Sequence, residues 1–499
     1  MTNNFSFKTL LSPIILLLLL WLTRLPALDL FPLHNDEGLH LTRAVEVWEG
    51  HPFWAISDGK IINHWLIAAF YPQHAPVFVA RFATILISLL GLAAGYAWVR
   101  HLFGGLAAGL AASLWIASPY LFFFERLAFS DAQAGAWVVV ALWSSWRLAG
   151  SSRLRNAVLT GLIFAAAVLF KFTAAPYALS VILIVLFAKG FSRQSFIKLL
   201  VVVLITAACF AVPLLYLSLR GEDFFTVALG WVGSSSGNSP NFFVNVGHLW
   251  AQLIGYGSLG WVVLLLGGIL LMGYALMKMR RTINERAVAL LCLAVIIPLL
   301  VMMLLGNNVL ARHYVVALPL LLCLGGAGLG IGLRRIPSPR QRRVIAAVEI
   351  AGLTIGIAPF MLTAYQNPQA LPLPDDVRYE HITSHSAGYG LREALQDFPA
   401  ILTRPDLPVI GSMFPDSCRR ANFYAQDGLT MLCTDAPGLP QIELALAEHG
   451  AVYVLADNAP SIGVDISIVD ATATRIAAYP RPGETDANAS VVLWLLEKK

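Results

Sequence analysis

Residues 14–22 read Ile-Ile-Leu-Leu-Leu-Leu-Leu-Trp-Leu, an unbroken run of apolar side chains. Residues 199–212 form a second run that is nearly as apolar. Each run lies in a block of roughly 18–25 apolar residues, which is the length that a helix needs to cross about 30 Å of hydrocarbon. A membrane β-barrel would instead show segments of about ten residues in which apolar and polar side chains alternate. These runs therefore predict membrane-spanning helices.

The whole chain has the composition of a membrane protein. Of its 499 residues, 58% are hydrophobic and 13% are charged, and the mean hydropathy is +0.70. These values lie outside the usual range of soluble globular proteins and argue against a soluble fold. We predict an all-α polytopic membrane domain with about eleven transmembrane helices. The expected spans are residues 10–27, 75–99, 105–124, 132–146, 157–170, 176–188, 199–217, 250–277, 287–305, 315–333 and 344–363.

Cationic residues concentrate in every second loop between these spans. They are Lys8, Arg100, Arg147, Arg153, Arg155, Lys189, Arg193, Lys198, Lys278, Arg280, Arg281, Arg286, Arg334, Arg335, Arg340, Arg342 and Arg343. Because basic loops stay on the cytoplasmic side, this pattern places the N-terminus in the cytoplasm of a multi-pass protein of the cytoplasmic (plasma) membrane. The net charge of +5 then reflects orientation, and we expect no nucleic-acid partner.

The segment after Thr363 has a different pattern. Short β-like runs at residues 407–412, 429–434, 451–456 and 490–495 alternate with helical stretches at 390–401 and 440–449. Such alternation predicts a small C-terminal α/β domain, which an odd number of spans places outside the cytoplasm. We therefore expect a transmembrane domain at residues 1–363, which includes a first outer loop at residues 29–74, and a soluble extracytoplasmic domain at residues 364–499.

The five cysteines divide between these domains. Cys209, Cys292 and Cys323 fall in expected spans, where cysteine behaves as a small apolar residue. Cys418 and Cys433 fall in the outer domain. An oxidising exterior permits a disulfide between them, but their spacing does not establish one.

The first span has a second interpretation. Lys8 before an apolar run and small residues near Ala27 are also typical of a cleaved signal peptide. We favour a retained helix, because the acidic and basic residues that follow it directly are unusual for a new N-terminus.

Charged and polar residues collect in the outer connections. They are His34, Asp36, Glu37, His40 and Arg43, then Lys60, His64 and Arg81, then Glu125, Arg126 and Asp131, then Lys171, and finally Arg312 and His313. Charges near membrane depth cost free energy, so those that remain at the ends of apolar spans are candidates for function.

The pair Asp36 and Glu37 opens a segment whose helical pattern continues to Trp48. Paired carboxylates at the mouth of a membrane cavity suit general-base chemistry, because partial burial raises a carboxylate pKa while nearby cations lower it. The alternative is structural, since acidic residues are also common as caps in the first turn of a helix.

Three cations, Arg126, Lys171 and Arg312, lie at the outer ends of different spans. Several cations at one membrane surface indicate a negatively charged partner, and a lipid phosphate fits because Arg binds it through a planar fork and Lys as a point charge. Each could instead anchor the protein to ordinary head groups, although such anchoring favours the cytoplasmic side.

The remaining outer residues also have structural interpretations that need no catalytic role. Glu125 and Arg126 could form a local ion pair, and Asp131 could cap the fourth span. His64 and His313 could carry protons or be ordinary polar residues at the interface. The acidic residues could coordinate a divalent cation, but no ligand spacing is diagnostic of a metal site.

Five short motifs resemble those of the GT-C glycosyltransferases that use polyprenyl-phosphate sugars, in particular the protein mannosyltransferase and aminoarabinose transferase branch (glycosyltransferase family 39-like). The motifs are the Asp36-Glu37 pair, Lys60 through Asn63-His64-Trp65-Leu66-Ile67-Ala68 to Ala80-Arg81-Phe82, Glu125-Arg126-Leu127-Ala128-Phe129-Ser130-Asp131, Lys171-Phe172-Thr173-Ala174, and Arg312-His313-Tyr314 followed by Pro319.

The resemblance implies a role for each matched residue. Asp36 would be the base or an acid that positions the acceptor, assisted by Glu37, and Asp131 would be a second acidic site residue. The donor phosphate would be held by Lys60, Arg126, Lys171 and Arg312. Apart from the resemblance, the other outer residues are candidates for binding the substrate, namely His40, Arg43, His64 and His313. One departure concerns the first loop, where Ile61-Ile62 stands in place of a common Pro-Pro and puts the role of Lys60 in doubt.

We therefore predict a glycosyltransferase that moves a hexosyl or pentosyl group from a polyprenyl-phosphate donor to a glycan, lipid or protein acceptor, with membrane lipid around it. The main alternative is a secondary transporter or lipid flippase that uses the outer charges to bind substrate. No clear repeat relates the two halves of the sequence, and the charges lie at the ends of spans, which disfavours a transporter. A membrane sensor would leave the acidic pair and the outer cations without a role.

Overall fold

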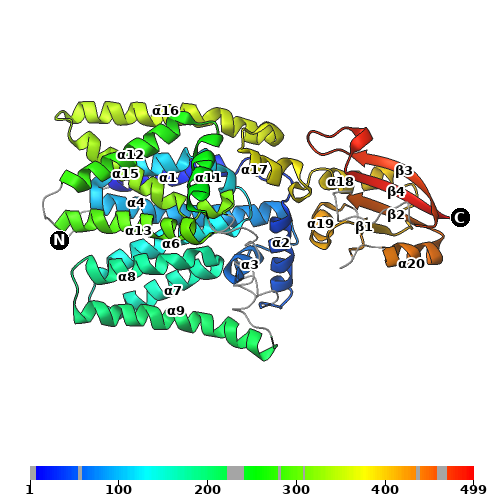
Figure 1. Cartoon of the computed structure of the whole chain (residues 1–499), viewed down its shortest axis with the longest axis horizontal. Coiled ribbons are helices and arrows are strands. Elements are labelled where there is room, and N and C mark those ends of the chain that lie inside the picture. Colours follow the sequence, from blue (N-terminus) through cyan, green and yellow to red (C-terminus); the bar gives the residue numbers. More distant parts are fainter. Residues whose placement is uncertain are drawn as a thin grey trace. The chain divides into compact units, whose positions relative to one another are not determined.

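The computed structural model describes residues 7–53, 59–221, 241–278, 283–306, 309–426, 428–433, 439–457 and 469–499 (Figure 1). The loop at residues 220–248, whose Gly, Ser and Asn content is typical of a mobile lid, lies mostly outside these ranges. The chain divides into two compact units. The helical unit contains Met1–Leu28, Gly50–Phe70 and Arg81–Pro372, and the sheet unit contains Asp29–Glu49, Tyr71–Ala80 and Leu373–Lys499.

Helices account for the structure of the helical unit. They are α1 (Phe7–Arg24), α3 (Ile61–Ala68), α4 (Pro76–Ile116), α5 (Pro119–Glu125), α6 (Ser130–Ala149), α7 (Leu154–Phe170), η2 (Phe172–Tyr177), α8 (Ala178–Phe187), α9 (Arg193–Leu219), α11 (Phe242–Gly255), α12 (Leu259–Lys278), α13 (Ile283–Leu305), α14 (Ala311–Tyr314), α15 (Leu318–Arg334), α16 (Pro339–Gln366) and η3 (Pro368–Ala370). The first residues of α4 belong to the sheet unit.

Among the described residues, four helices are long and apolar enough to cross a membrane. They lie at Pro76–Ile116, Arg193–Leu219, Leu259–Met277 and Pro339–Gln366. Five shorter apolar helices accompany them, at Ser12–Arg24, Leu154–Phe170, Phe172–Phe187, Ala289–Leu305 and Leu318–Arg334. The prediction of a helical membrane domain is confirmed, whereas the count of about eleven spans stays a prediction.

Two glycines with positive φ mark helix boundaries in this unit, one between two expected spans and one inside an expected span. Gly104 has φ 80° inside α4, and it falls in the gap between the spans expected at residues 75–99 and 105–124. Gly257 has φ 73° between α11 and α12. The single span expected at residues 250–277 is therefore two helices, because a glycine in this conformation ends a helix at little steric cost.

Helix α15 packs through its glycines. A Cβ atom on Gly326 or Gly330 would collide with Ala111 or Ala107 of α4, and one on Gly328 would collide with the Gly268 carbonyl of α12. Small residues spaced along a helix allow backbones to come this close, which increases dispersion contacts where no hydrophobic effect operates between helices. The glycines therefore fix α15 between α4 and α12.

We expect Gly268→Ala to destabilise the protein by about 1–3 kcal/mol, because the new methyl group would overlap the Gly325 carbonyl. Gly267→Ala is the matched control, since its Cβ would meet open space. Thermal unfolding in detergent measures both. Equal loss of stability in the two variants would contradict the proposed close contact.

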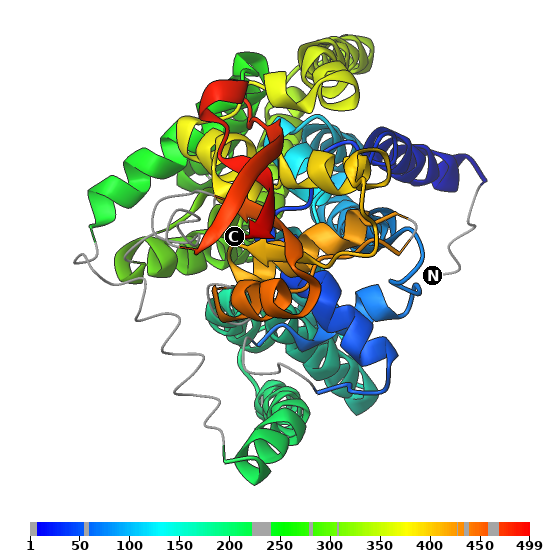
Figure 2. The same ribbon diagram turned by 90° about the vertical axis from the view of Figure 1, so that its right-hand side faces the viewer.

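The sheet unit contains four strands in the order β1-β2-β4-β3, which are drawn in orange to red in Figures 1 and 2. The strands are β1 (Val409–Ser412), β2 (Ala451–Asp457), β3 (Ala471–Tyr479) and β4 (Val491–Lys498). β1 and β2 are parallel, and β4 is antiparallel to both β2 and β3. The helical segments are α2 (Asn35–Trp48), α17 (Asp375–Arg378), η4 (Tyr379–Thr383), η5 (His385–Ala387), α18 (Leu391–Ile401), α19 (Pro415–Ala421), η6 (Asn422–Tyr424), α20 (Leu439–His449) and η8 (Asp486–Asn488).

The two faces of the sheet bury different helices. Tyr453 and Leu455 of β2 share a core with Phe398 of α18. Val452 and Val454 share another core with Ile442 of α20. Because successive strand residues point to opposite faces, this alternation makes a layer of helix on each side of the sheet. The predicted C-terminal α/β fold is confirmed.

Most of the elements expected in this unit are present. The runs at 407–412, 451–456 and 490–495 correspond to β1, β2 and β4, and the helical stretches correspond to α18 and α20. The run at 429–434 was wrong as a strand, since its described part makes a single bridge from Leu432 to Ile410. Strand β3 was missed, because its Ala- and Thr-rich sequence lies at an exposed edge and gives no apolar alternation.

A disulfide joins Cys418 of α19 to Cys433, with 5.6 Å between their Cα atoms. The side chain of Asn422 holds the same loop, because it donates to the Met431 carbonyl over 2.9 Å and accepts from the Met431 amide over 2.8 Å. Leu432 also accepts a hydrogen bond from Gly411 of β1. These links fix α19 beside the parallel strand β1.

Candidate functional site

The helical unit contains a buried ion pair between Asp131 and Lys171. Asp131 lies in the first turn of α6, and Lys171 is the extended residue between α7 and η2. The Lys171 Nζ lies 2.5 Å from the Asp131 Oδ1. The other carboxylate oxygen of Asp131 is buried and has no hydrogen-bond partner among the described residues. Asp131 therefore holds Lys171 through one oxygen and keeps a second oxygen unsatisfied.

Further polar groups surround this pair. Arg312 and Lys60 lie within electrostatic range of the Lys171 ammonium, and the Arg312 guanidinium lies 5.5 Å from the centre of the Phe129 ring. His313 is within range of the same groups. The structure thus brings together five of the residues expected from the sequence, namely Lys60, Asp131, Lys171, Arg312 and His313, and we call them the lysine cluster.

Burial controls the charge of two members, both of which lie outside the membrane spans expected from the sequence. It lowers the pKa of Lys171 to about 8; the ion pair with Asp131 opposes this effect, while Arg312 and Lys60 add to it. Burial and the charge of Lys171 lower the pKa of His313 to about 3. The imidazole is therefore neutral, and its Nδ1 accepts from the Leu310 amide over 3.2 Å.

Helix α3 begins at the lysine cluster. Lys60 precedes the helix, and its neighbour Gly59 packs so tightly on Phe172 that a Cβ atom would come within 2.8 Å of the ring. Ile61 is buried with Leu169. Asn63 and His64 are buried further along α3, and neither amide atom of Asn63 has a hydrogen-bond partner among the described residues. An unsatisfied buried amide costs free energy, so Asn63 is a candidate ligand contact that the sequence analysis did not single out.

Arg126 belongs to a second cluster in the helical unit. Its guanidinium donates to the carbonyls of Arg24 over 3.2 Å and Ala27 over 3.0 Å. It also lies 5.0 Å from the ring centres of Phe122 and Tyr365. The charged neighbours that affect it are Arg81 and Arg24, not the members of the lysine cluster.

Glu125 does not pair with Arg126. Its carboxylate accepts from Arg24 Nε over 2.9 Å and from Trp115 Nε1 over 2.8 Å. Arg24 donates in addition to the Ile116 carbonyl over 3.0 Å. The partner of Glu125 is therefore an arginine about a hundred residues earlier in the chain, and sequence proximity gave no indication of it.

We expect Arg24→Met to cost about 3–5 kcal/mol of stability, because it leaves the buried Glu125 carboxylate without its cation. The double variant Arg24→Met/Glu125→Met removes both charges and should recover a large part of this loss. Thermal unfolding of the single and double variants tests the pair. A double variant no more stable than Arg24→Met would contradict it.

The acidic pair lies at the start of α2 in the sheet unit. His34 precedes the helix, and its Nδ1 accepts from the Asp36 amide over 3.1 Å. The Glu37 carboxylate accepts from the His34 amide over 3.0 Å and is fully buried. Asp36 is half-buried and takes no part in this capping box through its side chain. The structure therefore gives Glu37 a capping role and leaves Asp36 the more accessible carboxylate.

Helix α19 positions the start of α2. Arg420 is buried and donates to the Leu33 carbonyl over 2.9 Å and to the carbonyls of His385, over 2.6 Å, and Ser386. A Cβ atom on Gly38 would collide with the Arg420 side chain. Ser417 donates to Asn35 over 3.4 Å. The helix that carries the disulfide thus also fixes the helix that carries Asp36.

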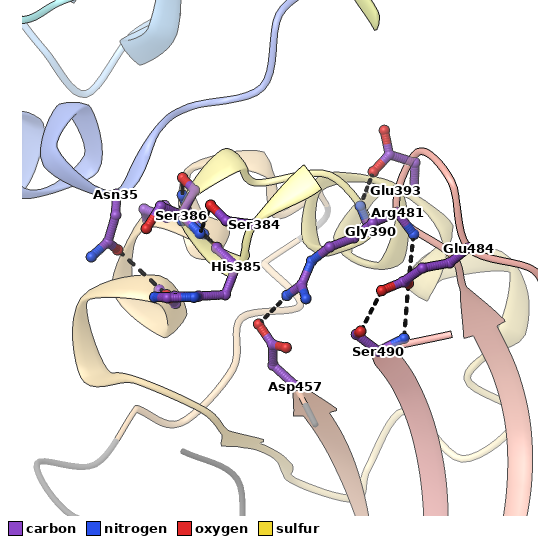
Figure 3. Close-up of polar contacts among 12 residues, drawn as sticks. Asn35, Ser384, His385, Ser386, Gly390, Glu393, Asp457, Arg481, Glu484 and Ser490 are labelled. Carbon is purple, nitrogen blue, oxygen red and sulfur yellow. Dashed lines mark hydrogen bonds and ion pairs between the residues drawn. The ribbon is translucent and has the colours of Figure 1, made fainter. Parts of the chain in front are cut away.

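Other polar side chains lie in the sheet unit (Figure 3). The His34 Nε2 lies 3.7 Å from the Glu380 Oε1, and the centre of the His34 ring lies 4.8 Å from that of the His381 ring. At the end of β2, Asp457 pairs with Arg481 over 2.5 Å (Figure 3). His40 is buried in α2, and Arg43 is half-buried. The described residues contain no group of three or more His, Cys, Asp or Glu side chains arranged to hold a metal ion.

Comparisons with known proteins identify the fold. Residues 59–216, which contain Lys60, Arg126, Asp131 and Lys171, match the model of the dolichyl-phosphate-mannose-protein mannosyltransferase family. No curated protein sequence matches the chain. Among solved structures, ArnT from Cupriavidus metallidurans bound to undecaprenyl phosphate is similar, with a TM-score of 0.61 and 16% identity over 98% of both chains. Its apo state gives a TM-score of 0.63 and 16% identity over 98% of this chain and 97% of that one.

A third structure has the same architecture. The apo form of the Archaeoglobus fulgidus oligosaccharyltransferase gives a TM-score of 0.53 and 14% identity over 92% of this chain and 70% of that one. The chain therefore has the fold of the GT-C membrane glycosyltransferases, and the resemblance expected from the motifs is confirmed. This fold and the family match support a transferase.

Proposed function

We propose that this protein transfers a sugar from a polyprenyl-phosphate donor to a glycan, lipid or protein acceptor on the outer face of the cytoplasmic membrane. The main support is the lysine cluster, in which a buried carboxylate holds one ammonium group and two further cations lie within electrostatic range. Such a set of cations suits a phosphate. ArnT, which has the same fold, was solved bound to undecaprenyl phosphate.

The lysine cluster would act on the leaving group. The bond between the anomeric carbon and the donor phosphate breaks, and the bonding electron pair leaves with the phosphate. Lys171, Lys60 and Arg312 would stabilise this negative charge, while positive charge develops on the sugar. Asp131 would orient Lys171 through its short ion pair. His313 and His64 are proposed to contact the bound substrate.

Asp36 would act as the general base. It takes the proton of the attacking hydroxyl or amine as that group bonds to the anomeric carbon, whether the transferred sugar is a hexose or a pentose. Its accessibility supports this role, and the capping contact of Glu37 supports an assisting role in which Glu37 holds the helix start. His40 and Arg43 on the same helix are proposed to contact the acceptor.

Arg126 would act differently from the role that the resemblance implies. Its contacts to two backbone carbonyls favour positioning of the chain after α1 over phosphate binding.

The wider proposal keeps about eleven spans, a cytoplasmic N-terminus and an outer C-terminal domain, as the distribution of basic loops predicts.

Asp36→Asn should lower the rate of sugar transfer by roughly 10²–10⁴-fold, because the amide cannot accept the proton. Glu37→Gln should lose far less, because its amide oxygen still accepts from the His34 amide. The measurement is transfer from a panel of radiolabelled polyprenyl-phosphate sugars in membranes with matched amounts of inserted protein.

The exposed Arg193 of α9 provides a matched control, and Arg193→Gln should transfer at the parental rate. Normal transfer by Asp36→Asn would refute its assignment as base. No transfer by the parent protein from any polyprenyl-phosphate sugar would count against the proposed function itself.

The value of kcat/KM should fall as pH rises through about 8. The free enzyme binds phosphate through the charged Lys171, whose pKa is lowered to about 8 by burial, so the ammonium is present below that pH and lost above it. Lys171→Arg keeps its charge and should move the decline to higher pH. An unchanged profile in this variant would show that another group controls the decline.

A further inference from the structure

The helical unit has a large cavity that the proposed reaction does not use. Its volume is about 1120 Å³, and it is lined by residues of α1, α4 and α6 and by Lys189, which follows α8. Pockets for small molecules usually measure about 300–1,000 Å³. The cavity is therefore large enough for a head group and part of a hydrocarbon chain.

This cavity lies far from the lysine cluster. Arg147 lines it near the end of α6, whereas Asp131 lies in the first turn of the same helix. Sixteen residues of helix at 1.5 Å each separate the two by about 24 Å. The basic loops predict that the Arg147 end faces the cytoplasm. The cavity is thus distinct from the proposed donor-phosphate site.

The charged part of the lining is cationic. It comprises the exposed side chains of Arg100, Arg147 and Lys189, and no Asp or Glu is among the described residues that line the cavity. His101 and Tyr96 add uncharged polar groups. The Lys189 side chain passes over Gly150. Its Cε lies 3.7 Å from the position that a Cβ atom on Gly150 would occupy. Arg fixes a phosphate through its planar fork, and Lys adds a point charge.

The rest of the lining is apolar. It includes Leu16 and Leu17 of α1, Leu92 of α4, and Trp143 and Trp146 of α6. The rings of Trp143 and His101 lie 5.7 Å apart, which brings an apolar and a polar group together. Such aromatic side chains prefer the depth of lipid head groups. The cavity therefore combines a site for an anion with a wall for a hydrocarbon chain.

We propose that this cavity binds one anionic phospholipid from the surrounding leaflet, with its phosphate at Arg100, Arg147 and Lys189 and its acyl chain along α1. This differs from the ordinary attraction of surface cations to an anionic membrane, which does not select a single lipid molecule. The occupied cavity fills the space between α1 and the rest of the bundle and thereby stabilises the helical unit.

The test uses the full chain in phosphatidylcholine nanodiscs titrated with phosphatidylglycerol. Native mass spectrometry counts the lipid retained per chain, and thermal unfolding reports stabilisation. We expect retention of one phosphatidylglycerol that saturates. Arg100→Gln/Arg147→Gln should weaken it by about tenfold or more, because charge-assisted hydrogen bonds are lost. Ala97→Phe should also weaken it by filling the cavity without changing charge.

Arg153→Gln/Arg155→Gln is the matched control, since it removes the same charge from exposed positions that do not line the cavity. It should leave retention unchanged. Three results would overturn the proposal: an equally large loss of phosphatidylglycerol retention in this control, retention that does not saturate, or equal retention of phosphatidylcholine. Preferential retention of polyprenyl phosphate would overturn the assignment to a phospholipid. Binding of inorganic phosphate with the same affinity would show that the acyl chain of the lipid contributes nothing, and would overturn that part of the proposal.

Discussion

Backbone carbonyls at the end of α1 and just after it need donors, because a bilayer offers no water to satisfy them. Three side chains meet this requirement. Arg126 donates to the carbonyls of Arg24 and Ala27, Arg81 donates to that of Leu28 over 2.5 Å, and Tyr365 donates to that of Thr23. These donors come from the loop after α5, from α4 and from α16. The requirement of one helix end thus ties together parts of the chain that are distant in sequence.

The cations of the helical unit divide according to what they satisfy. Three arginines bond to groups of the protein itself, namely to backbone carbonyls and to Glu125, and so stabilise the fold. They are Arg24, Arg81 and Arg126. Lys171 is held by a single carboxylate oxygen and has further cations within electrostatic range. Concentrated positive charge with so little negative charge suits an anionic ligand. A count of charges along the sequence does not distinguish these two uses.

Sequence patterns predicted the parts that depend on local composition. Apolar runs located the helices, and Asp131 and Lys171 were recognised because charge is rare beside such runs. The partner of Glu125 was not predictable, since Arg24 closes a contact across more than a hundred positions that no periodicity marks. Likewise β3 lies at an edge and is held by backbone pairing to β4, which needs no apolar alternation in its own side chains.

The glycine contacts of α15 carry a consequence for motion. Where backbones touch α4 and α12 without intervening side chains, a rocking movement would open an empty gap and lose dispersion contacts on both sides. We therefore expect α4, α12 and α15 to move little relative to one another. A rearrangement that admits a bulky lipid would therefore fall on other helices of the unit.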